Sequence, residues 1–293
     1  MAITVNTNVS SMIVQRNLAQ STTALNTAIE RMTTGYKINR AADNAAGYSI
    51  ARNWETQISS LDVAADNAAT AADMLATLED NYALISSHVQ RVRDLTEQAA
   101  NGTYGDQSKK AIESEIQARL DEIDRIAANC EFNGIELMKG GTTAGTPGAA
   151  GIDIQVGIDS SATKSRIHLD SSLFSNGRVA GLFTNSENLA KKCAGLVEGT
   201  GNTAQEQLDE IDSVITKISE RITTLGAAQN RIDSAIESLG VQSENITSSL
   251  STLRDADVAT ESSNYIKAQI LQQASATLLA TANQSPSIAL NLL

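Results

Sequence analysis

The chain is poor in cysteine, proline and aromatic residues: two cysteines, two prolines and 3% aromatics among 293 positions. Because proline is rare, the apolar 41% of the chain, largely Ala, Leu, Ile and Val, can run in long helices. Cys130 and Cys193 are too few and too far apart in sequence for a disulfide framework or a zinc site. We expect free thiols, with one bridge between them as the alternative.

Dense runs of Lys or Arg are also missing, and the formal net charge is −12. Such a chain is repelled by phosphate backbones and anionic lipid, so we expect no nucleic-acid partner. The first residues lack the basic and apolar regions of a cleaved secretion signal, and no stretch is apolar enough to span a bilayer. We expect no membrane insertion, and any secretion to proceed without a cleaved signal peptide.

The residues that carry chemistry are not grouped in any familiar pattern. His88 and His168 have no Cys or His at ligand spacing, and the glycine-rich stretch 140–151 lacks the Lys-Ser or Lys-Thr ending of a phosphate-binding loop. Asp255 and Asp257 are better suited to capping a helix junction than to binding a cation. The sequence therefore predicts no metal, no cofactor and no enzymatic activity.

What the chain does have is a heptad-like apolar pattern, which occurs once toward each end. The first run comprises Ile58, Leu61, Ala65, Ala68, Ala72, Leu75, Leu78, Tyr82, Ile85, Val89 and Val92. The second comprises Leu208, Ile211, Ile215, Ile218, Ile222, Leu225, Gln229, Ile232, Ile236 and Leu239. Two successive steps of three around Leu75 predict a local overwinding of any supercoil, with the helix continuing through it. Each run predicts a helix of roughly 45 to 60 Å.

A shorter helix is expected over 108–129, after a turn at Gly102-Thr-Tyr-Gly105 that reverses the chain. The Asn133-Gly134 turn and the alternating segments 152–156 and 166–169 predict small β-hairpins that cap one end of the helices. We therefore predict a mainly α fold, an elongated rod of antiparallel coiled-coil helices from both ends of the chain, with a small hairpin region in the middle.

Both chain ends carry sparse apolar positions among Ala, Ser, Thr, Asn and Gln. The positions expected to drive self-association are Val5, Val9, Ile13, Leu18, Leu25, Ile29, Met32, Ile270, Leu271, Leu278 and Leu279. Because large side chains are few, neither segment should be stable when folded alone. We therefore expect other copies of the chain to complete the core of these segments. The predicted domains are 1–45 with 255–293, 46–139 with 204–254, and 140–203.

The two ends also contain sequence words that resemble bacterial flagellin. At the start these are Val5-Asn-Thr-Asn8, Gln15-Arg-Asn-Leu18 and Glu30-Arg-Met-Thr-Thr-Gly-Tyr-Lys-Ile-Asn39. Toward the end they are Leu225-Gly-Ala-Ala-Gln-Asn-Arg231, Leu253-Arg-Asp-Ala-Asp257 and Ala282-Asn-Gln-Ser-Pro286 with the closing Leu292-Leu293. The resemblance covers 1–138 and 207–293, and the centre lacks the large outer domains of many flagellins.

This resemblance implies a subunit that polymerises into an extracellular flagellar filament for swimming. It implies that 1–45 and 255–293 are disordered in the monomer and pair in the filament's inner tube. It further implies export without a cleaved signal, an export chaperone, a filament cap protein and a hook-filament junction protein as partners.

The segment around Arg91 resembles the face through which flagellins pack along a protofilament and are bound by the host Toll-like receptor for flagellin. The matching residues are Gln90, Arg91, Arg93, Asp94, Leu95, Gln98 and Glu115. The family usually has Glu where Asp94 stands. Arg91, Asp94, Leu95 and Gln98 share one helical face, rotated from the Val89 and Val92 seam, so we expect them to be available to a partner.

Two other structural roles fit the same features. A hook-filament junction protein shares terminal coiled coils of this kind, and a secreted coiled-coil adhesin or translocator is a more distant alternative. The closing leucines and the Arg91 segment favour the filament subunit.

Overall fold

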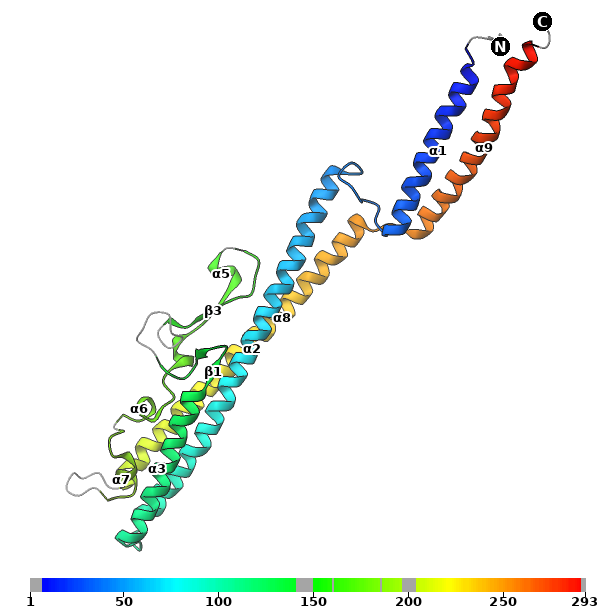
Figure 1. Ribbon diagram of the computed structural model, residues 1–293. Coiled ribbons are helices and arrows are strands. Elements are labelled where there is room, and N and C mark those ends of the chain that lie inside the picture. Colours follow the sequence, from blue (N-terminus) through cyan, green and yellow to red (C-terminus); the bar gives the residue numbers. More distant parts are fainter. Residues whose placement is uncertain (1–6, 141–149, 160, 185, 197–203, 291–293) are drawn as a thin grey trace. The chain divides into compact units, whose positions relative to one another are not determined.

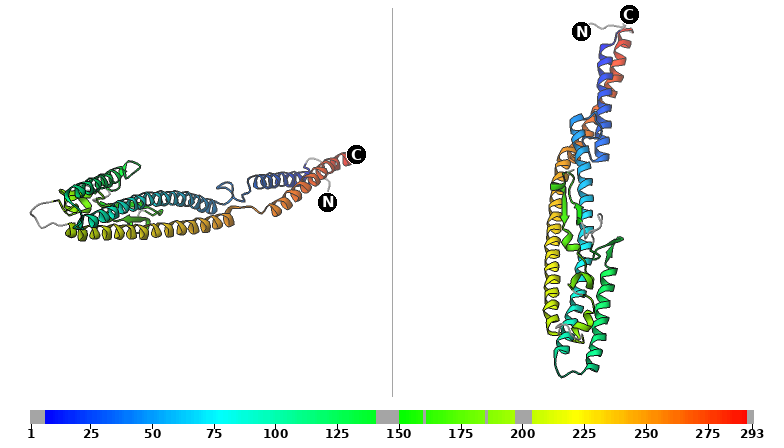
Figure 2. Two further views of the ribbon diagram at one scale, coloured as in Figure 1. Left: turned by 90° about the horizontal axis from the view of Figure 1, so that it is seen from below. Right: turned by 90° about the vertical axis from the view of Figure 1, so that its left-hand side faces the viewer.

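The computed structural model describes residues 7–140, 150–159, 161–184, 186–196 and 204–290 (Figures 1 and 2). The chain divides into two compact units. The terminal unit comprises Met1–Ile58 and Glu244–Leu293, and the central unit comprises Ser59–Ser243. The terminal unit therefore combines two segments that are remote in sequence, whereas the central unit is one continuous stretch.

Long helices dominate both units, and the short elements lie between them in sequence. The long helices are α1 (Val9–Thr34), α2 (Ala45–Ala100), α3 (Asp106–Asn129), α8 (Ala204–Arg254) and α9 (Val258–Leu290). The strands are β1 (Glu131–Phe132), β2 (Ile135–Glu136), β3 (Ile152–Gln155) and β4 (Arg166–Leu169). The short helices are α5 (Ala162–Ser165), η1 (Ser171–Phe174), α6 (Val179–Leu182) and α7 (Leu189–Cys193). The predicted class, mainly α with small hairpins in the middle, is confirmed.

The central unit is organised around α2, α3 and α8, whose apolar faces form one core. α2 and α8 run antiparallel: Gln229 donates to Glu79 at 2.8 Å, and Arg93 donates to Asp212 at 2.6 Å. The expected third helix is present as α3, and its apolar residues Ile112, Ile116, Leu120, Ile123, Ile126 and Ala127 are buried. The two distant heptad runs thus cover each other, as predicted.

The predicted seam on α2 was displaced by one residue at two of its positions. On α2 the observed seam of buried positions comprises Leu61, Ala64, Ala68, Ala71, Leu75, Leu78, Tyr82, Ile85, Val89 and Val92. Ala64 and Ala71 therefore take the places expected for Ala65 and Ala72, and the three and four residue steps alternate without interruption. The overwound step predicted near Leu75 is not needed, because it followed only from that choice of alanines.

The same displacement occurs on α8. Gln207, Val214 and Ala228 are buried, whereas Ile215, Ile222 and Ile236 lie partly buried against the edge of the core. The half-buried isoleucines widen the apolar face of the helix beyond a two-helix seam. This width is required because the core includes side chains from the central segment as well as from α2 and α3.

Both predicted hairpins are present. β1 pairs with β2 across Asn133 and Gly134, which both have positive φ angles of 49° and 77°. Asn followed by Gly is the dipeptide best suited to this two-residue turn, because both positions need left-handed backbone. β3 and β4 pair antiparallel with Ile152 opposite Leu169.

The segment between α3 and α8 lies along the helices and does not cap their end, which corrects the sequence-based expectation. Asn67 of α2 donates to the Gln155 carbonyl at 3.4 Å, and Val179 N donates to Asp124 of α3 at 2.8 Å. Tyr82 of α2 anchors the middle of the segment. Its side chain is fully buried, and its hydroxyl donates to the Ser175 carbonyl at 3.4 Å. Residues 141–149 and 197–203, which fall within the predicted variable region, lie outside the described residues.

Two general features of the described residues bear on function. Within them, none of the helices combines the length and hydrophobicity needed to cross a bilayer. Both cysteines are free and buried, in agreement with the expectation of unpaired thiols. Burial raises the pKa of each thiol to about 11, so neither is a reactive thiolate at neutral pH.

Candidate functional site

The first candidate surface is the terminal pair, the antiparallel helices α1 and α9, which lie side by side in Figure 1. Asn8 caps α1 by accepting the Ser11 N–H at 3.0 Å, and its amide donates to the Ala282 carbonyl at 2.7 Å. Further along, Gln272 donates to the Thr22 hydroxyl at 3.2 Å. Polar groups at matched depths thus fix the register of the two helices.

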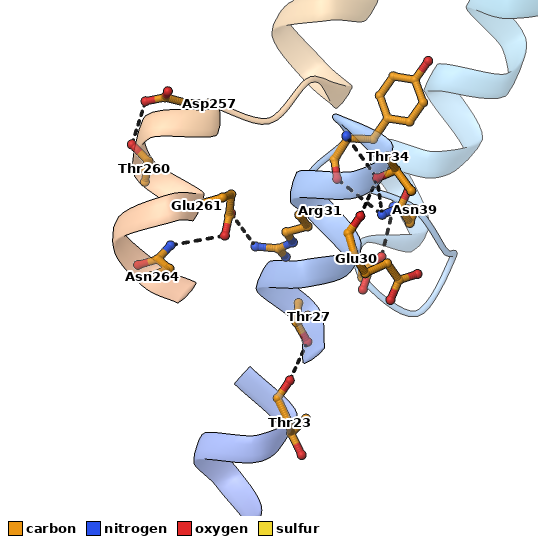
Figure 3. A network of polar contacts seen from close by, with 12 residues as sticks. Thr23, Thr27, Glu30, Arg31, Thr34, Asn39, Asp257, Thr260, Glu261 and Asn264 are labelled. Atoms are coloured by element: carbon orange, nitrogen blue, oxygen red, sulfur yellow. Dashed lines mark hydrogen bonds and ion pairs between the residues drawn. The ribbon is translucent and has the colours of Figure 1, made fainter. Parts of the chain in front are cut away.

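An ion pair fixes the other end of the terminal pair. Arg31 of α1 donates to Glu261 of α9 at 3.1 Å, and the Asn264 amide donates to the second Glu261 oxygen at 3.3 Å (Figure 3). The Glu261 side chain is only 11% exposed. Charge-assisted bonds to a largely buried carboxylate are among the stronger polar contacts in proteins, so this end is the better fixed one.

The fully buried positions between α1 and α9 are small or polar residues, and the large aliphatic residues on the same faces are at most half-buried. The buried positions are Ser11, Ser21, Ala28, Glu261, Ala268 and Ser275. The sequence reading missed them because it followed large apolar side chains. Their signal was available: positions 261, 268 and 275 repeat every seven residues, as expected where two helices pack closely through small side chains.

Most of the predicted self-association residues consequently face outward in the single chain. Those exposed are Val9, Ile13, Ile29, Ile270, Leu271 and Leu278. Those half-buried are Leu18, Leu25, Met32 and Leu279, and Val5 lies outside the described residues. The terminal pair therefore presents several large aliphatic side chains to solvent, a feature that marks interaction surfaces.

α9 begins at a capping aspartate, as the capping interpretation of the Asp255 and Asp257 pair predicted. The Asp257 carboxylate accepts the Thr260 hydroxyl at 2.6 Å and the Ala259 N–H at 3.0 Å. The Thr260 bond first, and then the Ala259 bond, lower the pKa of Asp257 below its usual value.

We expect this cap to weaken on acidification. Because the folded pKa is lowered, the stabilisation is present above the ordinary aspartate pKa of about 3.9 and is lost as the pH falls through the folded value. In protein whose α9 is folded, the Ala259 amide chemical shift should titrate with a midpoint below that value. Asp257→Asn, which keeps an acceptor but does not ionise, should abolish this titration, whereas a midpoint at or above the ordinary value would contradict the cap.

The second candidate surface is on α2 and α3 in the central unit. Arg91 of α2 donates through Nε and Nη2 to one Glu115 oxygen of α3, at 3.0 and 2.8 Å. Both side chains remain exposed, at 48% and 39%. Gln90, Asp94 and Gln98 are exposed on the same helix. We call Gln90, Arg91, Asp94, Gln98 and Glu115 the Arg91 surface.

Two residues predicted for this surface do not belong to it. Leu95 is 2% exposed and forms part of the core, because α2 is covered on more than one side and its apolar face extends past the Val89 and Val92 seam. Arg93 turns instead toward α8, where it pairs with Asp212. The predicted set is therefore divided between an exposed surface, the core and a second helix contact.

The described residues contain no group of His, Cys, Asp and Glu side chains that could hold a metal ion. What they define is a helical protein whose first and last long helices pair with each other and expose large aliphatic side chains, while its other long helices share a separate core.

Comparison with known proteins identifies the family. Residues 5–143 match the bacterial flagellin N-terminal helical region, and residues 208–293 match the bacterial flagellin C-terminal helical region. The chain therefore belongs to the bacterial flagellin family.

Individual relatives agree with this membership. The chain is 42% identical over 146 residues to B-type flagellin of Pseudomonas aeruginosa. This match covers 49% of this chain and 30% of the relative. It is also 42% identical over 138 residues to phase 1 flagellin of Salmonella naestved, a match that covers 47% of this chain and 27% of that relative. The chain thus spans less than a third of the length of these curated relatives.

Among solved structures, a flagellar hook-associated protein from Vibrio parahaemolyticus matches with a TM-score of 0.59 and 15% identity. The match covers 73% of this chain and all of that one. At this identity the match shows a shared fold and does not distinguish a filament subunit from a hook-associated one.

Proposed function

We propose that this protein is a structural subunit that polymerises through its terminal pair into an extracellular bacterial flagellar filament used for swimming. The observation that carries the proposal is the set of large aliphatic side chains exposed on α1 and α9. Burying each fully is worth about 1.5 to 3 kcal/mol, so covering several of them can offset the entropy lost when subunits associate.

The same proposal includes the family's route and partners. The subunit leaves the cell without a cleaved signal, escorted by an export chaperone, and adds beneath a filament cap protein to a hook-filament junction protein. In the single subunit, 1–45 and 255–293 are disordered and become ordered on assembly. Support comes from the family membership and from the contact between α1 and α9, whose fully buried positions are small or polar and which leaves many of their larger apolar side chains exposed.

Seeded assembly tests the function. The full chain, dissociated by mild heating and then mixed with seeds and precipitant, should grow long helical filaments visible by electron microscopy. Soluble helical monomers or short capped oligomers would reject the filament subunit and favour the hook-filament junction protein or another secreted coiled-coil protein.

We further propose that the Arg91 surface is recognised by the host Toll-like receptor for flagellin. Its support is the exposed pair of Arg91 and Glu115, an ion pair of neighbouring helices on an accessible part of the central unit. Arginines at protein interfaces often contribute more to the binding free energy than other residues, because the guanidinium makes several directed hydrogen bonds.

Arg91→Ala should lower receptor signalling by the monomer about tenfold or more, the loss that corresponds to about 1.4 kcal/mol of interface energy. The matched control is Arg125→Ala, which removes an exposed arginine whose partner, Glu122, lies on its own helix. Reporter cells carrying the receptor provide the measurement. Equal signalling by both variants would show that the surface is misassigned.

A further inference from the structure

A groove runs between α1 and α9 in the terminal pair, with a volume of about 1040 Å³. Its floor and walls include small residues such as Ala24, Ala28 and Ala274, together with the exposed side chains of Leu271 and Leu278. The Arg31 and Glu261 ion pair lies at one end (Figure 3). Small side chains in a groove flanked by leucines allow the ridge of another helix to approach closely.

A matching ridge lies on the same unit but on a different face. Ile266 and Ile270 of α9 are 51% and 59% exposed and stand one turn apart. At 3.6 residues per turn, they lie roughly 140 to 180° around the helix from Glu261, whereas Ala268 and Ser275 stay near the Glu261 direction. The ridge therefore points away from α1 and cannot enter the groove of its own chain.

The distribution of charge favours a second copy of this chain as the occupant. The terminal unit contains seven basic and seven acidic side chains, and so carries no net charge. The central unit contains 15 and 27, and so carries the whole net charge of −12. Contacts between the terminal units of two copies therefore incur no net electrostatic repulsion.

We propose that the groove of one copy receives the Ile266 and Ile270 ridge of another, which deepens the proposed function and rests on it. Groove and ridge are different patches, so the contact is heterologous: each copy uses its ridge on one neighbour and offers its groove to the next. A heterologous contact whose rotation does not close generates an open helical polymer. The pairing therefore explains growth as well as association.

Disulfide trapping tests the pairing, because a disulfide forms only where Cα atoms come within about 7 Å. Ala24→Cys marks the groove and Ile270→Cys marks the ridge. The two variants are mixed, polymerised with unmodified chain and briefly oxidised. Cys130 and Cys193 are buried with thiol pKa values raised to about 11, so they do not compete. The control ridge variant is Val258→Cys, at a similarly exposed position near the start of α9.

The expected result is a disulfide-linked dimer in filaments that contain both Ala24→Cys and Ile270→Cys copies. The linked dimer should not form when either variant is used alone or when the mixture is not polymerised. It should also not form when Ala24→Cys is combined with Val258→Cys. Exclusion of Ile270→Cys but not Val258→Cys from filaments of unmodified chain would also support the pairing. Filaments that incorporate both variants without a linked dimer overturn the pairing and leave the filament function standing. Failure of the unmodified chain to grow filaments overturns the function itself.

Discussion

Removing the terminal unit should abolish polymerisation completely while leaving a folded helical monomer. The truncated chain comprises residues 59–243, which are the central unit. Its core cluster, from Ala68 to Ile232, lies wholly within these bounds, so no core residue is lost. The outward aliphatic side chains of α1 and α9 are absent, and with them the surface proposed to bind other copies. What remains is a soluble, strongly acidic monomer.

Circular dichroism and sedimentation should show a helical monomer, and electron microscopy after seeding should show no filaments. The full chain prepared in parallel is the control for the seeds and the precipitant. A further measurement is incorporation: labelled truncated chain should be absent from filaments grown by the full chain. Filaments formed by residues 59–243 would mean that the central unit carries the assembly contacts. An unfolded product would mean that the central unit depends on the terminal one.

The central unit was largely predictable because its pattern is dense. Ile211, Ile218 and Ile232 fall at helical spacing, as do Leu75 and Leu78, and only a long helix places them on one side. The exact register was not predictable. Where two apolar residues adjoin, as at Val214 and Ile215, periodicity permits either at the seam, and the packing of neighbouring elements decides.

The terminal pair was less predictable for a physical reason. A sequence reading assumes that the largest apolar side chains of a helix face its partner. Here Ala268 and Ser275 face α1 while Ile270 and Leu278 face solvent. That assumption holds for a chain that buries its large apolar side chains within a single copy. It fails where the burial of large side chains depends on other copies, as we propose for these helices.

The Arg91 surface shows the same limit in a different form. The helical face that was predicted to contain Arg91 and Leu95 is divided, because α2 has neighbours on more than one side. Spacing along one helix cannot reveal which side a third element covers. The contact between Arg91 and Glu115, 24 positions apart, became definite only with the packing of α2 on α3.

Leu78→Ala should strongly destabilise the central unit, because Leu78 is fully buried between the packed helices. Removing its side chain loses its burial and leaves a cavity that the long, tightly packed helices cannot fill, a cost of about 2 to 5 kcal/mol. For a unit of this size each kcal/mol lowers Tm by about 2 to 4 °C. The measurement is urea unfolding of residues 59–243, followed by circular dichroism.

The matched control is Leu84→Ala on the same helix, since Leu84 is 53% exposed and less than two turns away. The two substitutions share the same chemistry and the same small gain in helix propensity, so the difference between them isolates burial. Leu84→Ala should change the free energy of unfolding by no more than about 0.5 kcal/mol. If the two variants unfold at the same urea concentration, Leu78 does not occupy the core, and the α2 seam that contains Leu75, Leu78 and Tyr82 is wrong. If only Leu78→Ala is destabilised, the stability of the central unit arises from that seam.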